Sequence, residues 1–191
     1  MATDTRARMV AAAMEALRRR GVAGMSFTEV LRTSGAARGA IYHHFPGGKA
    51  QLVAEAAGRT GQDVRAQLAS LPTSTPAAVV EAFLAAVRPV VDAATTGSGC
   101  AVAAVTMGLD PDRDALRQVA AGAFASWVDQ LAAQFTAAGV AQHEAGDLAA
   151  TLITLLEGAQ VLCRAAGTVE PFERAARTAS ALTACRYPDE C

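Results

Sequence analysis

The amino-acid sequence predicts an all-α fold, in which a small N-terminal head of three helices is joined by a long helix to a larger helical body. Alanine is frequent and only 5% of the residues are aromatic, a composition that favours helices over sheets. Glycine and proline recur at intervals that separate segments of helix length. The 191 residues suffice for such a head and body, and we expect domains at residues 1–48 and 49–191.

The first helix is expected at residues 4–20, where apolar side chains recur on one face. Arginines at positions 18–20 occupy its last turn, which suits the negative end of a helix dipole. Gly21 and Gly24 are expected to end this helix. Its apolar face contains Met9, Val10, Ala13, Met14 and Leu17.

A second helix is expected to begin after residue 26, because either Ser26 or Thr28 can cap its N-terminus. Gly35 can adopt the left-handed conformation that ends a helix and reverses the chain. The apolar side chains of this helix recur at i, i+3 and i+4 spacing, and they are Phe27, Val30 and Leu31.

A third helix is predicted at about residues 37–45, with Ile41 and Phe45 turned inward at i, i+4 spacing. Two helices separated by a glycine-containing turn, with hydrogen-bonding groups on the second, form the helix-turn-helix arrangement, in which the second helix enters the major groove of DNA. The outward side chains are Arg38, Tyr42, His43 and His44.

The side-chain types on this segment suit contact with double-stranded DNA. Arg38 can make a bidentate contact to guanine, and Tyr42 and His43 can bond phosphates or bases. Lys49 can neutralise a phosphate at a helix N-terminus. We also expect Thr28 and Thr33 to contact the DNA backbone, whereas the arginines at 18–20 are explained more simply as a solvated last turn.

The run GAARGAIYHHFPGGKAQL resembles the DNA-binding signature of the TetR family of transcriptional regulators, and its doubled glycine resembles the LmrA/YxaF-like branch. This resemblance implies DNA-contacting roles for Arg38, Tyr42, His43 and Lys49. It also implies a ligand-responsive repressor that binds a palindromic operator as a homodimer and is released by a small apolar or aromatic effector. The strong match covers about the first quarter of the chain.

The body is expected to consist of further helices separated by glycine and proline. Pro89 is expected to kink one of them, and Asp110 and Pro111 are expected to start another. The last two helices carry small and apolar residues that suit a dimer interface built as a four-helix bundle. The expected ranges are 49–71, 76–94, 100–109, 111–139, 142–166 and 170–184.

A ligand pocket is predicted among the body helices, although each of its residues taken alone is more often plain core or surface. Arg164 lies in an otherwise apolar stretch, where a buried arginine needs an anionic partner. Thr106 and Gln130 are further candidate polar groups. The principal candidates are Phe83, Val87, Met107, Phe124, Trp127, Leu131, Gln160 and Arg164.

The net charge of −1 hides an uneven distribution of charge. Residues 1–50 contain eight Arg or Lys and three Asp or Glu, whereas residues 51–191 contain nine and fifteen. A basic head on an acidic body is expected when only one end of a molecule meets phosphates.

The sequence contains no HExxH, GxSxG or P-loop pattern, so we expect no enzyme, cofactor or metal site. No run reaches the roughly 18 uncharged residues of a membrane span, and no secretory signal is evident, which favours a cytoplasmic location with reduced thiols. Two alternatives remain open: a helical protein that binds small molecules without reading DNA, and a redox sensor that uses Cys185 and Cys191.

Overall fold

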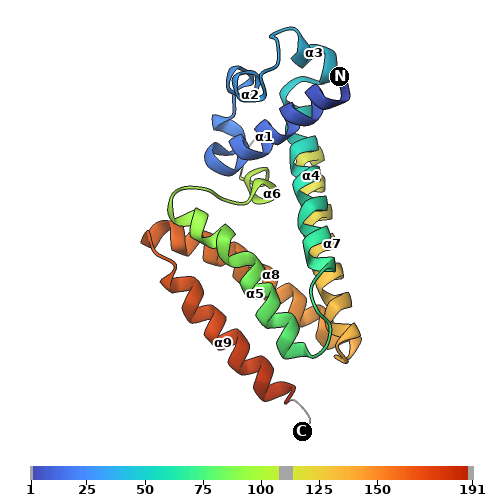
Figure 1. The fold of residues 1–191 in the computed structure, drawn as a ribbon, viewed down its shortest axis with the longest axis vertical. Coiled ribbons are helices and arrows are strands. Elements are labelled where there is room, and N and C mark those ends of the chain that lie inside the picture. Colours follow the sequence, from blue (N-terminus) through green and yellow to red (C-terminus); the bar gives the residue numbers. More distant parts are fainter. Residues whose placement is uncertain (1, 108–113, 189–191) are drawn as a thin grey trace. The chain divides into compact units, whose positions relative to one another are not determined.

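The computed structural model describes residues 2–107 and 114–188, and every regular element in these ranges is a helix (Figure 1). This confirms the all-α prediction. The helices are α1 (Ala2–Gly24), α2 (Phe27–Ser34), α3 (Ala40–His44), α4 (Gly48–Ala69), α5 (Pro76–Thr95), α6 (Ala101–Ala104), α7 (Asp114–Ala137), α8 (Gln142–Ala166) and α9 (Glu170–Arg186).

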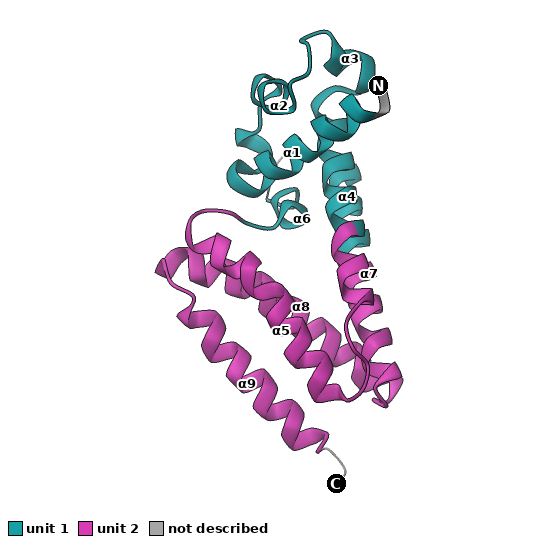
Figure 2. Cartoon of the chain, viewed as in Figure 1, with its two compact units in different colours: residues 1–62, 99–123 teal, residues 63–98, 124–191 magenta. Residues whose placement is uncertain are grey.

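Packing divides the chain into two compact units (Figure 2). Unit 1 comprises residues 1–62 and 99–123, and unit 2 comprises residues 63–98 and 124–191. Both α4 and α7 therefore contribute residues to each unit. Unit 1 therefore groups residues 48–62 of α4, and all of α6, with the N-terminal helices, and α6 packs on α1.

The core of unit 1 is built by the apolar faces of α1, α2 and α3. Gly21 interrupts α1 with φ of 65° and ψ of −175°, a conformation that glycine adopts without a steric penalty. The long regular part of α1 therefore ends before Gly21, as the sequence predicts. The side chains that fill this core are fully buried, and they include Met9, Leu17, Val30, Ile41 and Phe45.

Both ends of α2 are set by local chemistry that the sequence predicts. The Ser26 hydroxyl accepts a hydrogen bond from the Glu29 amide at 3.2 Å, so Ser26 is the N-cap residue and Thr28 is not. Gly35 follows the helix with φ of 66°, and its amide donates to the Leu31 carbonyl. The helix therefore starts and stops through its own caps.

Helix α3 is shorter than predicted, because it spans Ala40–His44 instead of residues 37–45. The Ala40 amide donates to the Ala37 carbonyl at 2.9 Å. This i to i+3 bond is typical of a tight turn, so the residues before Ala40 form a turn. Arg38 consequently lies in that turn and not in the helix.

Helix α6 and the start of α7 also differ from the prediction. Val105 and Thr106 donate to carbonyls three residues earlier, so the chain tightens into a turn after Ala104. The remaining residues of the predicted helix at 100–109 lie partly outside the described ranges. The predicted cap at Asp110 and start at Pro111 lie outside them altogether.

Unit 2 is organised around α5, α8 and α9, which pack against one another. Thr75 caps α5 by accepting from the Ala78 amide at 3.1 Å, and the helix continues through Pro89. The predicted bounds of α8 are confirmed, and Gly167 ends it with φ of 67°. The large side chains buried in this unit include Phe83, Trp127, Leu131, Phe135 and Phe172.

Within the described ranges, α8 is the one helix long and apolar enough to cross a membrane by length and composition alone. In its most apolar window, 39% of the residues are buried inside the structure. The buried face of α8 packs on α5 and α9. Part of this apolar helix is therefore left uncovered in a single chain.

Candidate nucleic-acid interface

The turn and helix at residues 38–44 carry polar side chains on their outer face, opposite side chains that are buried in the core. Ile41 and Phe45 are 1% and 0% exposed, which fixes α3 on the core of unit 1. Arg38, Tyr42 and His43 are exposed. Because Ile41 and Phe45 are one turn apart on the buried face, Tyr42 and His43 are turned away from it, whereas His44 is half-buried. The helix therefore offers a short polar face with its orientation set by the core.

Tyr42 on α3 packs against the preceding helix, α2. Its ring contacts the ring of Phe27 on α2 in a T-shaped arrangement, with 6.1 Å between the centroids and an interplanar angle of 86°. An edge-to-face pair of this kind orients the ring, yet 68% of Tyr42 remains exposed. An aromatic side chain that is both oriented and exposed is suited to touching a partner.

Arg38 is an exposed cation without an ion-pair partner in the described ranges. Arg32, in the last turn of α2, has the same property. The sequence pattern does not mark Arg32 as a contact residue. Its signal is the lack of an ion-pair partner among the described residues, which only the folded arrangement reveals. Both guanidinium groups are available to an external anion.

The remaining predicted contact residues lie at helix ends. Lys49 is half-buried in the first turn of α4, where backbone amides and the helix dipole also attract anions. Gly48 precedes it with φ of 67°, and the Gln51 side chain accepts from the Gly47 amide at 2.8 Å. On α2, the exposed threonines are Thr28 in the first turn and Thr33 in the last.

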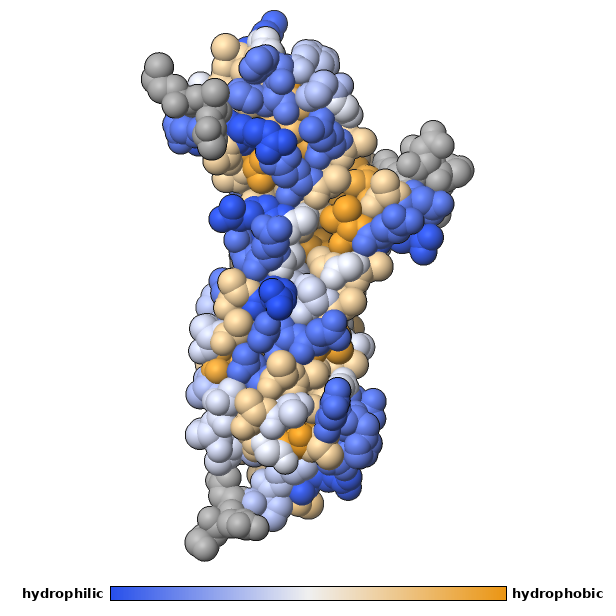
Figure 3. Space-filling view, turned by 90° about the vertical axis from the view of Figure 1, so that its right-hand side faces the viewer, coloured by the Kyte–Doolittle hydropathy of each residue, from blue (hydrophilic) through white to orange (hydrophobic). Residues whose placement is uncertain are grey.

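Two arginines at the end of α1 are already paired inside unit 1. Arg19 pairs with Glu15 on the same helix, and Arg20 lies 3.1 Å from the Glu29 carboxylate on α2. These pairs reduce the charge that α1 can offer to a phosphate. Arg32 on α2 and Arg38 in the turn before α3 have no such partner in the described ranges. On the face shown in Figure 3, unit 1 carries many hydrophilic residues beside apolar ones.

The predicted ligand-pocket residues fall mostly in the core of unit 2. Phe83 and Trp127 are fully buried, Val87 is buried, and Phe124 is half-buried with its ring 5.0 Å from that of Trp127. Gln160 is 5% exposed, and its Oε1 atom has no hydrogen-bond partner within the described residues. A buried amide oxygen without a donor is unusual in a folded protein.

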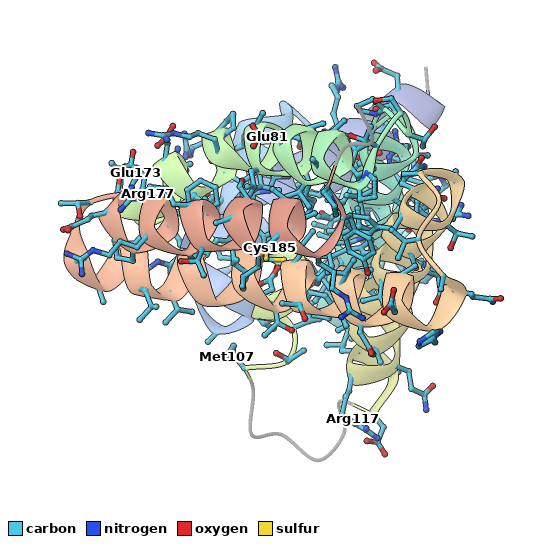
Figure 4. All side chains as sticks on the ribbon, turned by 90° about the horizontal axis from the view of Figure 1, so that it is seen from below. Glu81, Met107, Arg117, Glu173, Arg177 and Cys185 are labelled. Carbon is cyan, nitrogen blue, oxygen red and sulfur yellow. The ribbon has the colours of Figure 1, made fainter. Side chains whose placement is uncertain are left out.

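Two pocket predictions require correction. Met107 belongs to unit 1 and is 84% exposed (Figure 4), so it is not a buried side chain. Arg164 is also exposed, and it donates to the Gly97 carbonyl at 3.3 Å. Arg164 lies in the last turn of α8, one turn after the buried Gln160. A backbone carbonyl takes the place of the expected anion.

A hollow of about 380 Å³ lies instead between α5, α8 and α9. None of the predicted pocket residues lines it. At its rim, Glu144 pairs with Arg186 and accepts a hydrogen bond from the Tyr187 hydroxyl at 2.9 Å. Its apolar lining includes Val80, Leu148, Leu152, Ala179 and Leu182.

The cysteines form no obvious redox pair among the described residues. Cys163 is buried, Cys100 is half-buried, and Cys185 is exposed on α9 (Figure 4). Cys191 lies outside the described ranges. In the same ranges, no group of three or more His, Cys, Asp or Glu side chains is placed to hold a metal ion.

The fold and the outward face of α3 define a helix-turn-helix regulator that binds DNA. Family models agree: residues 9–56 match "Bacterial regulatory proteins, tetR family", and residues 76–178 match "Transcriptional regulator LmrA/YxaF-like, C-terminal domain". The chain belongs to the TetR family of transcriptional regulators, in its LmrA/YxaF-like branch. The family consists of regulators and not of enzymes.

Individual relatives cover nearly the whole chain. An uncharacterized HTH-type transcriptional regulator of Mycobacterium tuberculosis is 32% identical over 189 residues, which is 96% of each chain. The HTH-type transcriptional regulator LmrA of Bacillus subtilis is 24% identical and covers 88% of this chain and 91% of its own. The similarity therefore includes both the head and the body.

Solved structures share the fold. The crystal structure of a TetR transcriptional regulator from Chloroflexus aurantiacus has a TM-score of 0.75 at 24% identity, with 94% of each chain covered. A TetR-family regulator from Agrobacterium tumefaciens has a TM-score of 0.78 at 21% identity, with 96% of this chain and 99% of that chain covered. At these identities the comparison concerns the fold alone.

Proposed function

We propose that this TetR-family regulator is a ligand-responsive repressor that binds a palindromic DNA operator as a homodimer. The observation that carries this proposal is the outward face around α3. Arg38, Tyr42 and His43 are exposed there, on a helix held by buried Ile41 and Phe45. Arg38 reads a base edge, and Tyr42 and His43 bind the DNA backbone or bases.

Flanking residues fix the position of the reading helix on the duplex. Lys49 and the amides of the first turn of α4 bind one phosphate. Thr28, Thr33 and the unpaired Arg32 on α2 bind the neighbouring backbone. These contacts carry little sequence information, so base discrimination falls mainly to Arg38.

Operator affinity requires two heads, because a single reading helix contacts only a few base pairs. Apolar side chains on α8 and α9 support a dimer through these helices: Val161, Leu162 and Leu182 are 67%, 59% and 66% exposed. Exposed apolar side chains gathered on two adjacent helices mark an interface with another protein surface. Helices α8 and α9 then form a four-helix bundle with those of the partner.

The hollow between α5, α8 and α9 belongs to this same interface. Leu182 both lines the hollow and is exposed on the surface of α9. A partner side chain can therefore enter the hollow when the two α8–α9 faces meet. We assign this space to the dimer contact and not to the effector.

The effector site lies in the core of unit 2, where Gln160 supplies the main polar contact. Its unpartnered Oε1 is the supporting observation, because an effector that donates a hydrogen bond can satisfy it. Phe83, Val87, Phe124 and Trp127 provide apolar and aromatic contacts of the kind found in small-molecule sites. The effector is therefore a small apolar or aromatic molecule with a hydrogen-bond donor.

Effector binding releases DNA through α4. This helix begins three residues after Phe45 and contributes residues to both units. A shift of its C-terminal part in unit 2 can change the spacing of two reading helices in a dimer, so that only one state fits the operator. The protein acts in the cytoplasm, without a membrane partner.

DNA footprinting tests this function directly. The operator is expected near the regulator's own gene and a neighbouring transporter or modifying enzyme. The purified chain should protect an inverted repeat there, and an aromatic compound library should contain members that abolish the protection. Absence of any protection at low salt would support instead a helical ligand-binding protein that does not read DNA.

A further inference from the structure

Arg6 on α1 joins two residues that lie far from it in the sequence. Its guanidinium carbon lies 5.0 Å from the centroid of the Phe45 ring. The same guanidinium forms an ion pair with the Glu55 carboxylate on α4. All three residues belong to unit 1. One side chain therefore connects α1, the end of α3 and the start of α4.

Phe45 is the residue through which α3 passes into α4. Its amide donates to the Ile41 carbonyl at 2.7 Å and so ends the reading helix. Its carbonyl accepts from the Gly48 amide at 2.9 Å, immediately before α4. A change in the position of the Phe45 ring therefore changes the orientation of α3 relative to the core.

The two contacts of Arg6 depend on each other. The side chains of Arg6 and Glu55 are 40% and 29% exposed, so either contact alone is weak in water. The flexible arginine side chain can also extend into solvent. Glu55 removes that freedom and keeps the guanidinium over the ring.

We propose that Arg6 is a positioning residue for the reading helix: Glu55 holds it on Phe45, and the pair sets the orientation of α3 without touching DNA. This inference rests on the proposed DNA-reading function. It predicts that loss of either partner weakens specific binding more than non-specific binding, because the phosphate contacts of α2 and Lys49 remain.

The main competing role for Arg6 is a direct contact to a DNA phosphate, and Glu55→Gln separates the two. Removing a negative charge from a DNA-binding head strengthens binding to every duplex if electrostatics alone matters. If Glu55 positions Arg6, the same variant weakens binding to the operator. The two roles therefore predict opposite signs.

The experiment measures the affinity of the full chain for a duplex selected by the wild-type protein and for a scrambled duplex. The variants are Arg6→Met, Arg6→Lys, Glu55→Gln and the double variant Arg6→Met/Glu55→Gln. Matched controls are Arg19→Met and Glu15→Gln, which break an ion pair within α1. Melting temperatures are measured in parallel, because a purely structural role lowers stability and weakens binding to both duplexes in proportion.

We expect Arg6→Met and Glu55→Gln each to weaken binding to the selected duplex about five- to tenfold, and binding to the scrambled duplex less than about twofold. The double variant should be no weaker than Arg6→Met, because the two residues act as one unit. Arg6→Lys should recover part of the loss. If Glu55→Gln tightens binding to both duplexes, or behaves like Glu15→Gln, the inference is wrong.

Hydrogen exchange of the DNA-free protein gives an independent test. The amides of Phe45 and Gly48 should exchange faster in Arg6→Met and Glu55→Gln than in the controls, because the helix end loses its support. Unchanged exchange contradicts the inference even if binding changes. If the wild-type chain selects no duplex, the proposed function fails, and hydrogen exchange alone decides the role of Arg6.

Discussion

At the scale of single residues, the proposed DNA reading depends on a few exposed side chains whose neighbours are buried. Arg38 is free of ion pairs in the described ranges, and Tyr42 is supported by Phe27. Lys49 sits at the positive end of α4. Because these residues differ in what they can contact, their substitution should produce different patterns of loss.

Arg38→Ala should relax base discrimination at one position of each half-site. Loss of a bidentate arginine contact weakens the binding free energy by about 1–3 kcal/mol for duplexes with the correct base, and by little for other sequences. Fluorescence anisotropy with the selected duplex and its single-base variants measures this loss. Arg65→Ala, an exposed arginine on α4, is the control. A uniform loss across all duplexes argues against base reading by Arg38.

Lys49→Ala should weaken binding to all duplexes alike. A lysine that neutralises one phosphate contributes about one unit to the slope of log affinity against log salt. Titrations at several salt concentrations should therefore give a shallower slope for the variant. An unchanged slope, or a loss confined to one sequence, contradicts the phosphate contact.

The sequence predicts exposed and buried positions well where helical periodicity is strong. Ile41 and Phe45 are buried as predicted, and Tyr42 and His43 are exposed. Arg164 was expected to be buried but is exposed, because it lies in the last turn of α8 and bonds to Gly97, which is distant in sequence. Arg32 was missed for a similar reason, since its lack of a partner is a property of the fold.

At the scale of helices, bounds set by local caps were predictable and bounds set by neighbours were not. Ser26, Gly35 and Gly167 act as caps, and α2 and α8 have the predicted ends. Helices α3 and α6 are too short to be stable on their own, so tertiary contacts decide where they start. Both are shorter than the sequence pattern indicates.

Close packing of α4 on α7 makes Gly61 intolerant of a side chain. A Cβ atom at Gly61 would lie 2.8 Å from the Cβ of Ala123, whereas one at Gly58 would meet nothing within 4 Å. Gly61→Ala should therefore lower the free energy of unfolding by about 1–3 kcal/mol. Gly58→Ala on the same helix should raise it by up to about 1 kcal/mol. Urea unfolding of both variants tests this, and equal effects contradict it.

The contact between the start of α8 and the end of α9 should depend on pH. The hydrogen bond from Arg186, and then that from Tyr187, hold the pKa of Glu144 below its usual range. A carboxyl group with a lowered pKa stabilises the folded state above its unfolded pKa, and this contribution is lost as pH falls through the folded value.

Comparison of wild type with Glu144→Gln measures this contribution. The wild type should be more stable in urea near neutral pH, and the difference should shrink as the pH falls through the folded-state pKa of Glu144. Asp129→Asn, an exposed carboxylate on α7, is the control. A difference that stays constant over this range would mean that the ionisation of Glu144 does not stabilise the contact.

At the scale of the whole molecule, charge and apolar surface are distributed in keeping with a DNA-binding dimer. Residues 1–50 carry a net charge of +5, although the chain as a whole carries −1. Exposed apolar side chains on α8 and α9 support pairing of two chains. The sequence predicted the fold, the family and this charge distribution, because each depends on long patterns. The sequence could not predict that Met107 is exposed, because its exposure depends on how α6 ends.

Selection of bound duplexes from a random DNA pool, at low and moderate salt, tests the central claim most directly. We expect enrichment of one inverted repeat at both salt concentrations, with half-sites separated by about one helical turn and weaker binding at the higher salt. Recovery of such a site establishes a dimeric DNA reader. Failure to enrich any sequence at either salt would contradict the assignment of α3 as the reading helix and, with it, operator-specific repression.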